Sequence, residues 1–229
     1  KLESSGRTIS QHYEQTADVL RSTVTWVDTS DMGHDAFHSE VKQNRGKIRN
    51  KEEAKAIMTI LKRIAEDDAL INYLNSVRKT DAAIGVICMY AEQKRYLQQL
   101  FNQNAWPEGF KDLVNIDTVD SYQGKQNKII ILSVTRNDPT KFPAFLKSPN
   151  RVNVALSRAM DRLVIFGASE MWQGVNSNLP LGRVLNYIKC RENQTLEYRY
   201  ISKRAIVKIV QNNPHINKNR SKKYRKAGV

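Results

Sequence analysis

Five short apolar runs alternate with segments of helical period along this chain of 229 residues. The runs occupy residues 24–27, 84–90, 113–119, 128–134 and 163–166. Runs of this length that are rich in Val and Ile are typical of buried strands, and a parallel connection between strands needs a crossover long enough to hold a helix. The sequence therefore predicts an α/β domain whose parallel sheet is flanked by helices on both faces.

Helices are expected between these strands. In the first of them Ile57, Leu61 and Ile64 recur at the helical period, behind acidic residues in the first turn. The expected helices are residues 52–67, 69–77, 92–101 and 180–190, with a further short helix between the last two strands. The expected division of the chain is an N-terminal extension (1–23), the α/β domain (24–198) and a basic C-terminal tail (199–229).

Two polar segments adjoin the strands. Residues 118–128 read Thr-Val-Asp-Ser-Tyr-Gln-Gly-Lys-Gln-Asn-Lys and lead from one strand into the next. Residues 151–159 read Arg-Val-Asn-Val-Ala-Leu-Ser-Arg-Ala and form the short helix before another strand. Open α/β sheets bind ligands at the carboxyl ends of their strands. The hydrogen-bonding and cationic groups of these segments therefore predict a site for a phosphate-rich ligand on one side of the sheet.

The chain is strongly basic, with 37 Lys and Arg against 23 Asp and Glu, a net charge of +14 and a pI near 9.8. Such an excess favours a polyanionic partner, because Lys and Arg gain affinity by releasing phosphate counterions. The alternative is that the charge only promotes solubility.

Cysteine content and hydropathy limit the cellular compartments that we expect for this protein. Cys88 and Cys190 provide no disulfide framework and suit a reducing cytosol or nucleus. No apolar run approaches the roughly 20 residues that a membrane helix needs, and no signal peptide opens the chain. We expect a cytoplasmic protein, or a nuclear one in a eukaryote, without a membrane partner.

Three segments, taken in order, resemble motifs of the superfamily 1 helicases. Residues 84–97 are similar to motif IV, residues 120–133 to motif V and residues 151–159 to motif VI. Their order resembles the second RecA-like domain of the nonsense-mediated-decay (up-frameshift) branch, and the resemblance covers roughly residues 24–190. It implies the C-terminal motor domain of an ATP-dependent helicase that moves 5′ to 3′ on single-stranded DNA or RNA.

The resemblance implies that Arg158 is the arginine finger of motif VI. Such a finger stabilises charge on the transferred γ-phosphate, and a planar guanidinium can hold two phosphate oxygens at once. The alternative is an ion pair of Arg158 at the sheet edge. Arg151 lies two helical turns earlier. It is expected either to brace the nucleotide site or to pair with Asp120.

Gly124, Lys125 and Gln126 are also expected in the nucleotide site. Glycine lets a ligand approach the backbone closely. Gln126 replaces the glutamate that the family places against the nucleotide ribose, so an uncharged acceptor remains there. The alternative for Gln126 is a solvated loop residue.

The resemblance further implies a track for the single strand. Hydroxyl groups suit phosphates, and aromatic rings suit base stacking. Either tyrosine of this set could instead belong to the core, and Cys88-Met89 replaces the Thr-Pro that usually precedes the motif IV tyrosine. The residues expected on the track are Tyr90, Gln93, Thr118, Ser121 and Tyr122.

The chain contains no Gly-x-x-x-x-Gly-Lys-[Ser/Thr] segment and no Asp-Glu pair of the Walker B kind. In the resembled family both belong to a preceding RecA-like domain of the same polypeptide. ATP with Mg²⁺ is therefore expected to bind only together with that domain, and the chain alone is expected to be inactive. The alternative is a non-catalytic nucleic-acid-binding module with a RecA-like fold.

Three further patterns give weaker functional signals. His34 and His38 have the spacing of a helical metal pair, but no further Cys or His lies near them in sequence, so no metal site is expected. Asp28, Asp117 and Asp120 form no nuclease-like cluster. Residues 204–225 are basic and lack Asp and Glu. They predict an extended tail that either adds electrostatic affinity for nucleic acid or is simply solvated.

Overall fold

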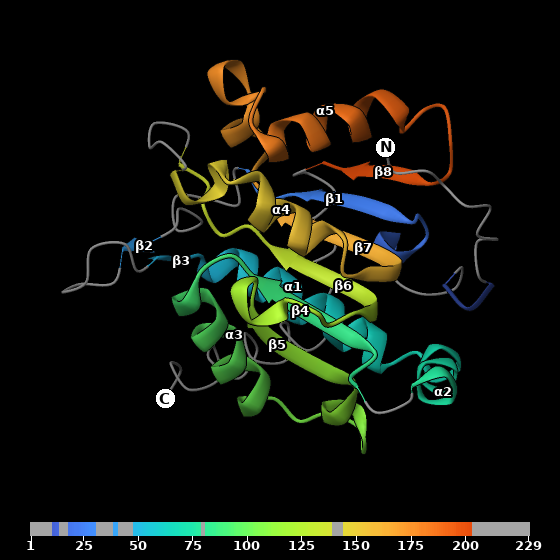
Figure 1. The fold of residues 1–229 in the computed structure, drawn as a ribbon. Helices are drawn as coiled ribbons and strands as arrows, with labels where there is room; N and C mark the ends of the chain where they lie inside the picture. Colours follow the sequence, from blue (N-terminus) through green and yellow to red (C-terminus); the bar gives the residue numbers. More distant parts are fainter. Residues whose placement is uncertain are drawn as a thin grey trace, which may run out of the picture.

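The computed structural model describes residues 11–13, 18–30, 39–40, 48–78, 81–138 and 144–202. Parallel strands form one six-stranded sheet in the order β5-β4-β6-β7-β1-β8 (Figure 1). Their bounds are β1 (Val24–Asp28), β4 (Ile84–Cys88), β5 (Val114–Thr118), β6 (Asn127–Ser133), β7 (Ala159–Gly167) and β8 (Tyr198–Ile201). A short antiparallel pair joins β2 (Ser39–Glu40) to β3 (Ile48–Arg49). The predicted α/β class with a parallel sheet is confirmed.

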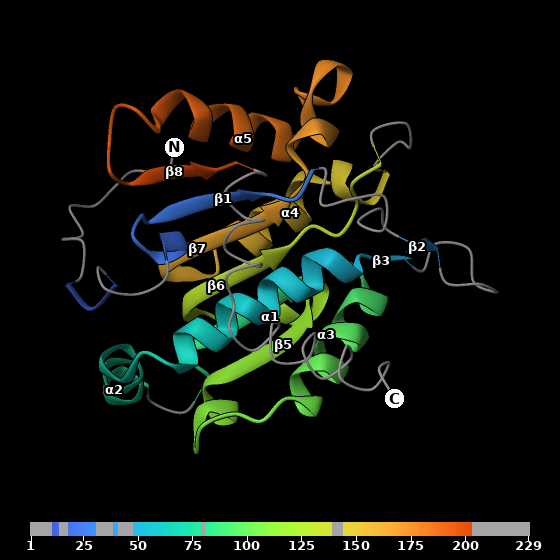
Figure 2. The same cartoon turned by 180° about the vertical axis from the view of Figure 1, so that it is seen from behind.

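Helices cover both faces of this sheet (Figure 1 and Figure 2). On one face lie α1 (Lys51–Ala65), α2 (Asp68–Val77) and α3 (Ala91–Gln103), and on the other α4 (Pro149–Leu156) and α5 (Pro180–Arg191). In β6, Ile131 packs into the first layer, whereas Ile130 and Leu132 pack into the second. All three are fully buried. Burial on both faces explains why the strands read as continuous apolar runs.

Short 3-10 helices connect several of these elements. They are η1 (Gln11–Tyr13), η2 (Asp18–Leu20), η4 (Phe110–Leu113), η5 (Asp120–Tyr122), η6 (Ala144–Lys147), η7 (Ser169–Trp172) and η8 (Gly174–Asn176). The first predicted helix is shorter than expected, because Asp67 caps the next one by accepting a hydrogen bond from the Leu70 N–H (3.0 Å).

Residues outside both expected bounds of the domain belong to its core or its sheet. Tyr13 and Leu20, from the segment expected to be an extension, are fully buried. β8 pairs with β1, and Tyr200 Oη donates a hydrogen bond to Asp28 Oδ2 (2.6 Å). The division of the chain at residues 23 and 198 stays a prediction.

Several sequence-based expectations concern segments outside the described residues, namely His34, His38 and the tail beyond residue 202. Within the described residues, no group of three or more His, Cys, Asp and Glu side chains is arranged to hold a metal ion. The helices of that same part are all too short or too polar to cross a bilayer.

Candidate nucleotide and nucleic-acid interface

The loop between β5 and β6 lies against the sheet. It begins with η5 at the carboxyl end of β5, where the Tyr122 ring turns inward and is fully buried. The Tyr122 hydroxyl accepts a hydrogen bond from Asn115 Nδ2 (3.3 Å), near the start of β5. Gly85 on β4 leaves room for that hydroxyl, because a Cβ on Gly85 would lie 2.4 Å from Tyr122 Oη. The loop therefore returns across the sheet, from the carboxyl ends of the strands toward their amino ends.

α4 lies beside this loop, and an arginine contacts each end of it. Arg151 Nε donates to Asp120 Oδ1 (3.2 Å), just after β5. Arg158 Nη1 donates to the backbone oxygen of Lys125 (3.3 Å), just before β6. Of the two roles expected for Arg151, the structure contains the pairing with Asp120. Residues 118–128 and 151–159 thus contact each other at both ends of the loop.

The predicted site residues do not gather at one edge of the sheet. Thr118 and Ser121 lie at the carboxyl end of β5, and Tyr90 follows the carboxyl end of β4. Arg158 instead precedes β7, and its carbonyl accepts a hydrogen bond from the Asn127 N–H (3.1 Å) at the start of β6. The expectation of a single ligand edge is therefore wrong. A loop and a helix that both cross the sheet bring Arg158 to the amino ends of the strands, whereas the Arg151–Asp120 pair and the Lys125 ammonium group lie toward the carboxyl ends with Thr118 and Ser121.

Arg158 is partly exposed and bonds only neutral groups. Besides the Lys125 contact, its Nε donates to the Val154 carbonyl (3.1 Å) and its Nη2 to Ser157 Oγ (2.9 Å). Among the described residues, no carboxylate pairs with this guanidinium. The alternative of an ion pair is thus not found in this part of the chain, and an anion can replace the present acceptors without breaking a salt bridge.

The loop beside Arg158 presents open backbone. Gly124 has φ +85°, and no atom lies within 4 Å of the position that a Cβ would occupy. Gly124, Lys125 and Gln126 are all exposed. A ligand can therefore approach this backbone closely, while the exposure of Gln126 fits both roles expected for it.

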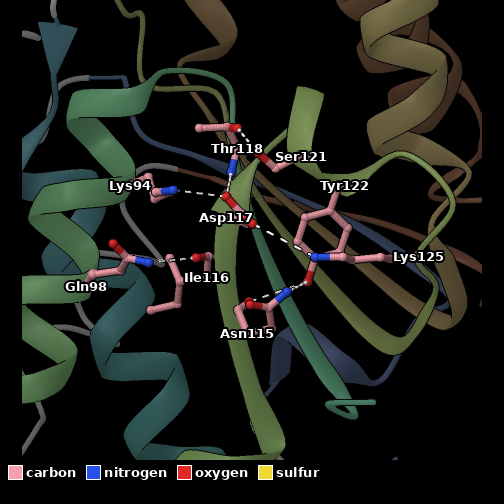
Figure 3. A network of polar contacts seen from close by, with 9 residues as sticks. All are labelled: Lys94, Gln98, Asn115, Ile116, Asp117, Thr118, Ser121, Tyr122 and Lys125. Atoms are coloured by element: carbon pink, nitrogen blue, oxygen red, sulfur yellow. Dashed lines mark hydrogen bonds and ion pairs between the residues drawn. The ribbon is translucent and has the colours of Figure 1, made fainter. Parts of the chain in front are cut away.

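Hydroxyl and ammonium groups surround Asp117 at the carboxyl end of β5 (Figure 3). Thr118 Oγ1 donates to Ser121 Oγ (3.0 Å), and Asp117 accepts hydrogen bonds from the Thr118 N–H (2.8 Å) and Lys94 Nζ (3.1 Å). Burial alone raises the pKa of Asp117, but the Thr118 N–H and the ammonium groups of Lys94 and Lys125 lower it overall. An ionised Asp117 between two lysines leaves a net positive charge beside two hydroxyls, which suits a phosphate group.

Gln93 and Tyr122 are fully buried, so their prediction as nucleic-acid contacts is wrong for this structure. Gln93 Nε2 donates to Ser133 Oγ (3.1 Å), and Gln93 Oε1 accepts from the Asn50 N–H (2.8 Å). Tyr122 belongs to the core, which was one of its two expected places. The residue type at a motif position does not reveal whether the side chain points inward. Tyr90 is only partly buried and stays a candidate.

A buried polar network behind Gln93 was not predicted. Glu53 on α1 is fully buried, and its Oε1 accepts hydrogen bonds from Ser133 Oγ and the Thr135 N–H (2.9 Å). Burial raises the pKa of Glu53 to about 8, although these hydrogen bonds oppose the rise. The available sequence signal was Asn50 three residues earlier, because its side chain caps α1 by accepting from the Glu53 N–H (2.9 Å).

Replacing Glu53 with glutamine should remove a pH dependence of stability. Folding raises the pKa of Glu53, so between about pH 4.5 and about pH 8 the folded chain retains a proton that the unfolded chain has released. The free energy of unfolding therefore falls as pH rises through this window, by up to about 1.4 kcal/mol per pH unit. Urea unfolding at several pH values measures this slope, which Glu53→Gln should flatten.

The matched control is Glu52→Gln, which removes a carboxyl from the same turn of α1. Glu52 is partly exposed and pairs with Lys55. The difference between the two variants isolates the buried group. Identical slopes in the wild type and in Glu53→Gln would contradict the shifted pKa.

Comparison with known proteins adds a family match over most of the chain. Residues 1–170 match the model of the AAA_12 family, an AAA domain. The chain is 40% identical over 87 residues to the ATP-dependent helicase NAM7 of Saccharomyces cerevisiae. It is 36% identical over 85 residues to the Regulator of nonsense transcripts 1 homolog of Drosophila melanogaster. It is 32% identical over 133 residues to the DNA polymerase alpha-associated DNA helicase A of Saccharomyces cerevisiae.

The matched relatives are much longer than this chain. The three alignments cover 37%, 37% and 56% of the chain, but only 9%, 7% and 18% of the respective relatives. The chain therefore spans less than a fifth of the length of these relatives.

Proposed function

Because this chain belongs to the AAA_12 family of AAA domains and is a superfamily 1 helicase domain of the up-frameshift type, we propose that it is the C-terminal motor domain of an ATP-dependent helicase acting on DNA or RNA. In this function it supplies the arginine finger and part of the single-strand track. A preceding P-loop domain of the same polypeptide supplies the rest of the ATP site.

The position of Arg158 supports this function most directly. The side chain is partly exposed at the end of α4 and contacts the loop that contains Gly124. As the γ-phosphoryl group is transferred, its oxygens carry charge that a nearby guanidinium stabilises. Arg158 has only neutral partners to exchange for those oxygens. It is therefore assigned the role of arginine finger.

ATP with Mg²⁺ would lie between this domain and the P-loop domain. Lys125 offers its exposed backbone beside Arg158, while its ammonium group lies 4.0 Å from Asp117 Oδ2. The Gln126 amide offers a donor and an acceptor to a ribose hydroxyl. Arg151, which pairs with Asp120, is assigned to bracing the loop. The ligands of Mg²⁺ are assigned to the P-loop domain, which carries the Walker B pair in the resembled family.

The single strand would follow the opposite edge of the sheet. Thr118 and Ser121 offer hydroxyls to phosphates, Lys94 adds an ammonium group beside them, and Tyr90 offers an aromatic ring. The net charge of +14 supports a polyanionic partner. Because Arg158 and the nucleic-acid candidates lie at opposite ends of one loop and one helix, closure around ATP would move the edge that holds the strand.

Measuring ATP turnover tests this function. The 229-residue chain alone should bind single-stranded oligonucleotide without hydrolysing ATP, whereas the polypeptide that also contains the P-loop domain should hydrolyse ATP, faster with the oligonucleotide present. Turnover by the chain alone would contradict the assignment of the P-loop to another domain. Binding of the oligonucleotide without turnover by the longer polypeptide would favour the second candidate, a non-catalytic binding module, which the exchange of glutamate for Gln126 supports.

A further inference from the structure

Thr135 has an unusual backbone conformation. Among the described residues it is the only non-glycine residue with positive φ, at +71°. This region is strongly disfavoured for a β-branched side chain and persists only where the surroundings enforce it. Residues held in this way gather at functional sites. The neighbours of Thr135 therefore indicate which side chain its conformation positions.

Buried groups hold Thr135 in place. Its N–H donates to both carboxyl oxygens of Glu53, at 2.9 and 3.2 Å. Its carbonyl accepts a hydrogen bond from Asn50 Nδ2 (3.3 Å). All three residues are at most 1% exposed. The turn after β6 is therefore fixed from inside the domain, at the carboxyl edge of the sheet.

The turn directs Arg136 toward two aromatic rings. Arg136 Nε donates to Tyr90 Oη (3.3 Å), and the Tyr90 ring lies 5.2 Å from the Phe145 ring, centroid to centroid. The Arg151 guanidinium lies 4.3 Å from the Phe145 ring centroid. Arginine, two aromatic rings and a second arginine thus form a row, and each of the four side chains is partly exposed.

The two arginines of this row differ in what they can still bind. Arg151 is already paired with Asp120. Arg136 uses one of its five N–H donors on Tyr90, and among the described residues no carboxylate pairs with it. Arg136 is therefore the cation of the row that is available to an anion.

We propose that Arg136, Tyr90 and Phe145 bind one nucleotide of a single strand, with Arg136 on its phosphate and Phe145 stacked on its base. This inference rests on the proposed nucleic-acid function and names a binding element of the carboxyl edge. Guanidinium groups bind phosphate oxygens in a bidentate way, and ring stacking tolerates every base. Thr135 is a positioning residue, because its strained turn fixes where Arg136 leaves the sheet.

Two probes separate the phosphate contact from the base contact. A fluorescein-labelled oligothymidylate carries both groups, and an abasic strand of the same length carries only the phosphates. Arg136→Ala should weaken binding of both probes by about tenfold and reduce the slope of log K against log salt by about 0.7. Arg136→Lys should restore the slope. Phe145→Leu should weaken binding of the oligothymidylate by on the order of tenfold and leave binding of the abasic strand unchanged.

The matched controls are Arg191→Ala and Tyr187→Leu. They disrupt a similar pair on α5, where the Arg191 guanidinium lies 5.5 Å from the Tyr187 ring centroid. Both controls should bind like the wild type, and thermal unfolding should verify that all variants are folded. Equal affinity and equal salt slope for Arg136→Ala and Arg191→Ala would overturn this inference and leave the proposed nucleic-acid function intact. Failure of the wild type to bind either probe would overturn the nucleic-acid function together with it.

Discussion

Arg158→Ala, made in the polypeptide that includes the P-loop domain, should lower the rate of ATP hydrolysis by about 10³- to 10⁵-fold while largely sparing ATP affinity. An arginine finger acts on charge that develops in the transition state, so its loss appears mainly in kcat. The structure supports this separation, because the present bonds of Arg158 go to two carbonyls and a hydroxyl. Steady-state hydrolysis and equilibrium binding of a non-hydrolysable analogue measure the two quantities.

Two controls refine that experiment. Arg158→Lys keeps the charge but loses the bidentate fork, so we expect only partial turnover. Arg183→Ala removes an exposed arginine from α5, outside the loop and α4, and should hydrolyse ATP like the wild type. Wild-type turnover by Arg158→Ala would remove Arg158 from the reaction. A large loss of ATP affinity in that variant would assign it to ground-state binding instead.

The central sheet was predictable because its strands are buried on both faces. Ile84, Val86 and Ile87, for instance, pack alternately into the two helical layers, and burial on both sides leaves a continuous apolar run in the sequence. β8 left no such signal. It is an edge strand with polar positions, held in part by the hydrogen bond of Tyr200 to Asp28, which lies 172 residues away in the sequence. A contact over that distance has no local pattern.

The candidate site was predictable in its motifs but not in its layout. From residue type and motif order, Arg158, Thr118 and Ser121 were expected on ligand-facing loops, and all three side chains are at least partly exposed. The inward rotation of Tyr122 was not predictable from residue type, because a tyrosine suits a core as well as a stacking surface. The positive φ of Thr135 was not predictable either, since it depends on Glu53, 82 residues earlier.

Gly85→Ala should destabilise the fold by about 2 kcal/mol or more. The added Cβ would lie 2.4 Å from Tyr122 Oη and 2.6 Å from both Asn127 Oδ1 and Ile130 Cδ1. Overpacking of a well-packed core typically costs about 1–3 kcal/mol. The matched control is Gly167→Ala on β7, where the nearest atoms would lie 3.1 Å or more away, so its cost should be smaller. Urea unfolding of both variants measures the difference.

A double-mutant cycle identifies the contact responsible. Tyr122→Phe removes the oxygen closest to the new methyl group, together with the hydrogen bond from Asn115. If that contact dominates, Gly85→Ala should cost less in the Tyr122→Phe background than in the wild type; strictly additive effects would refute this. The same clash should displace the loop that links Thr118 to Lys125. In the longer polypeptide, Gly85→Ala should therefore reduce both oligonucleotide binding and ATP turnover, whereas a purely structural cost would appear only in the unfolding measurement.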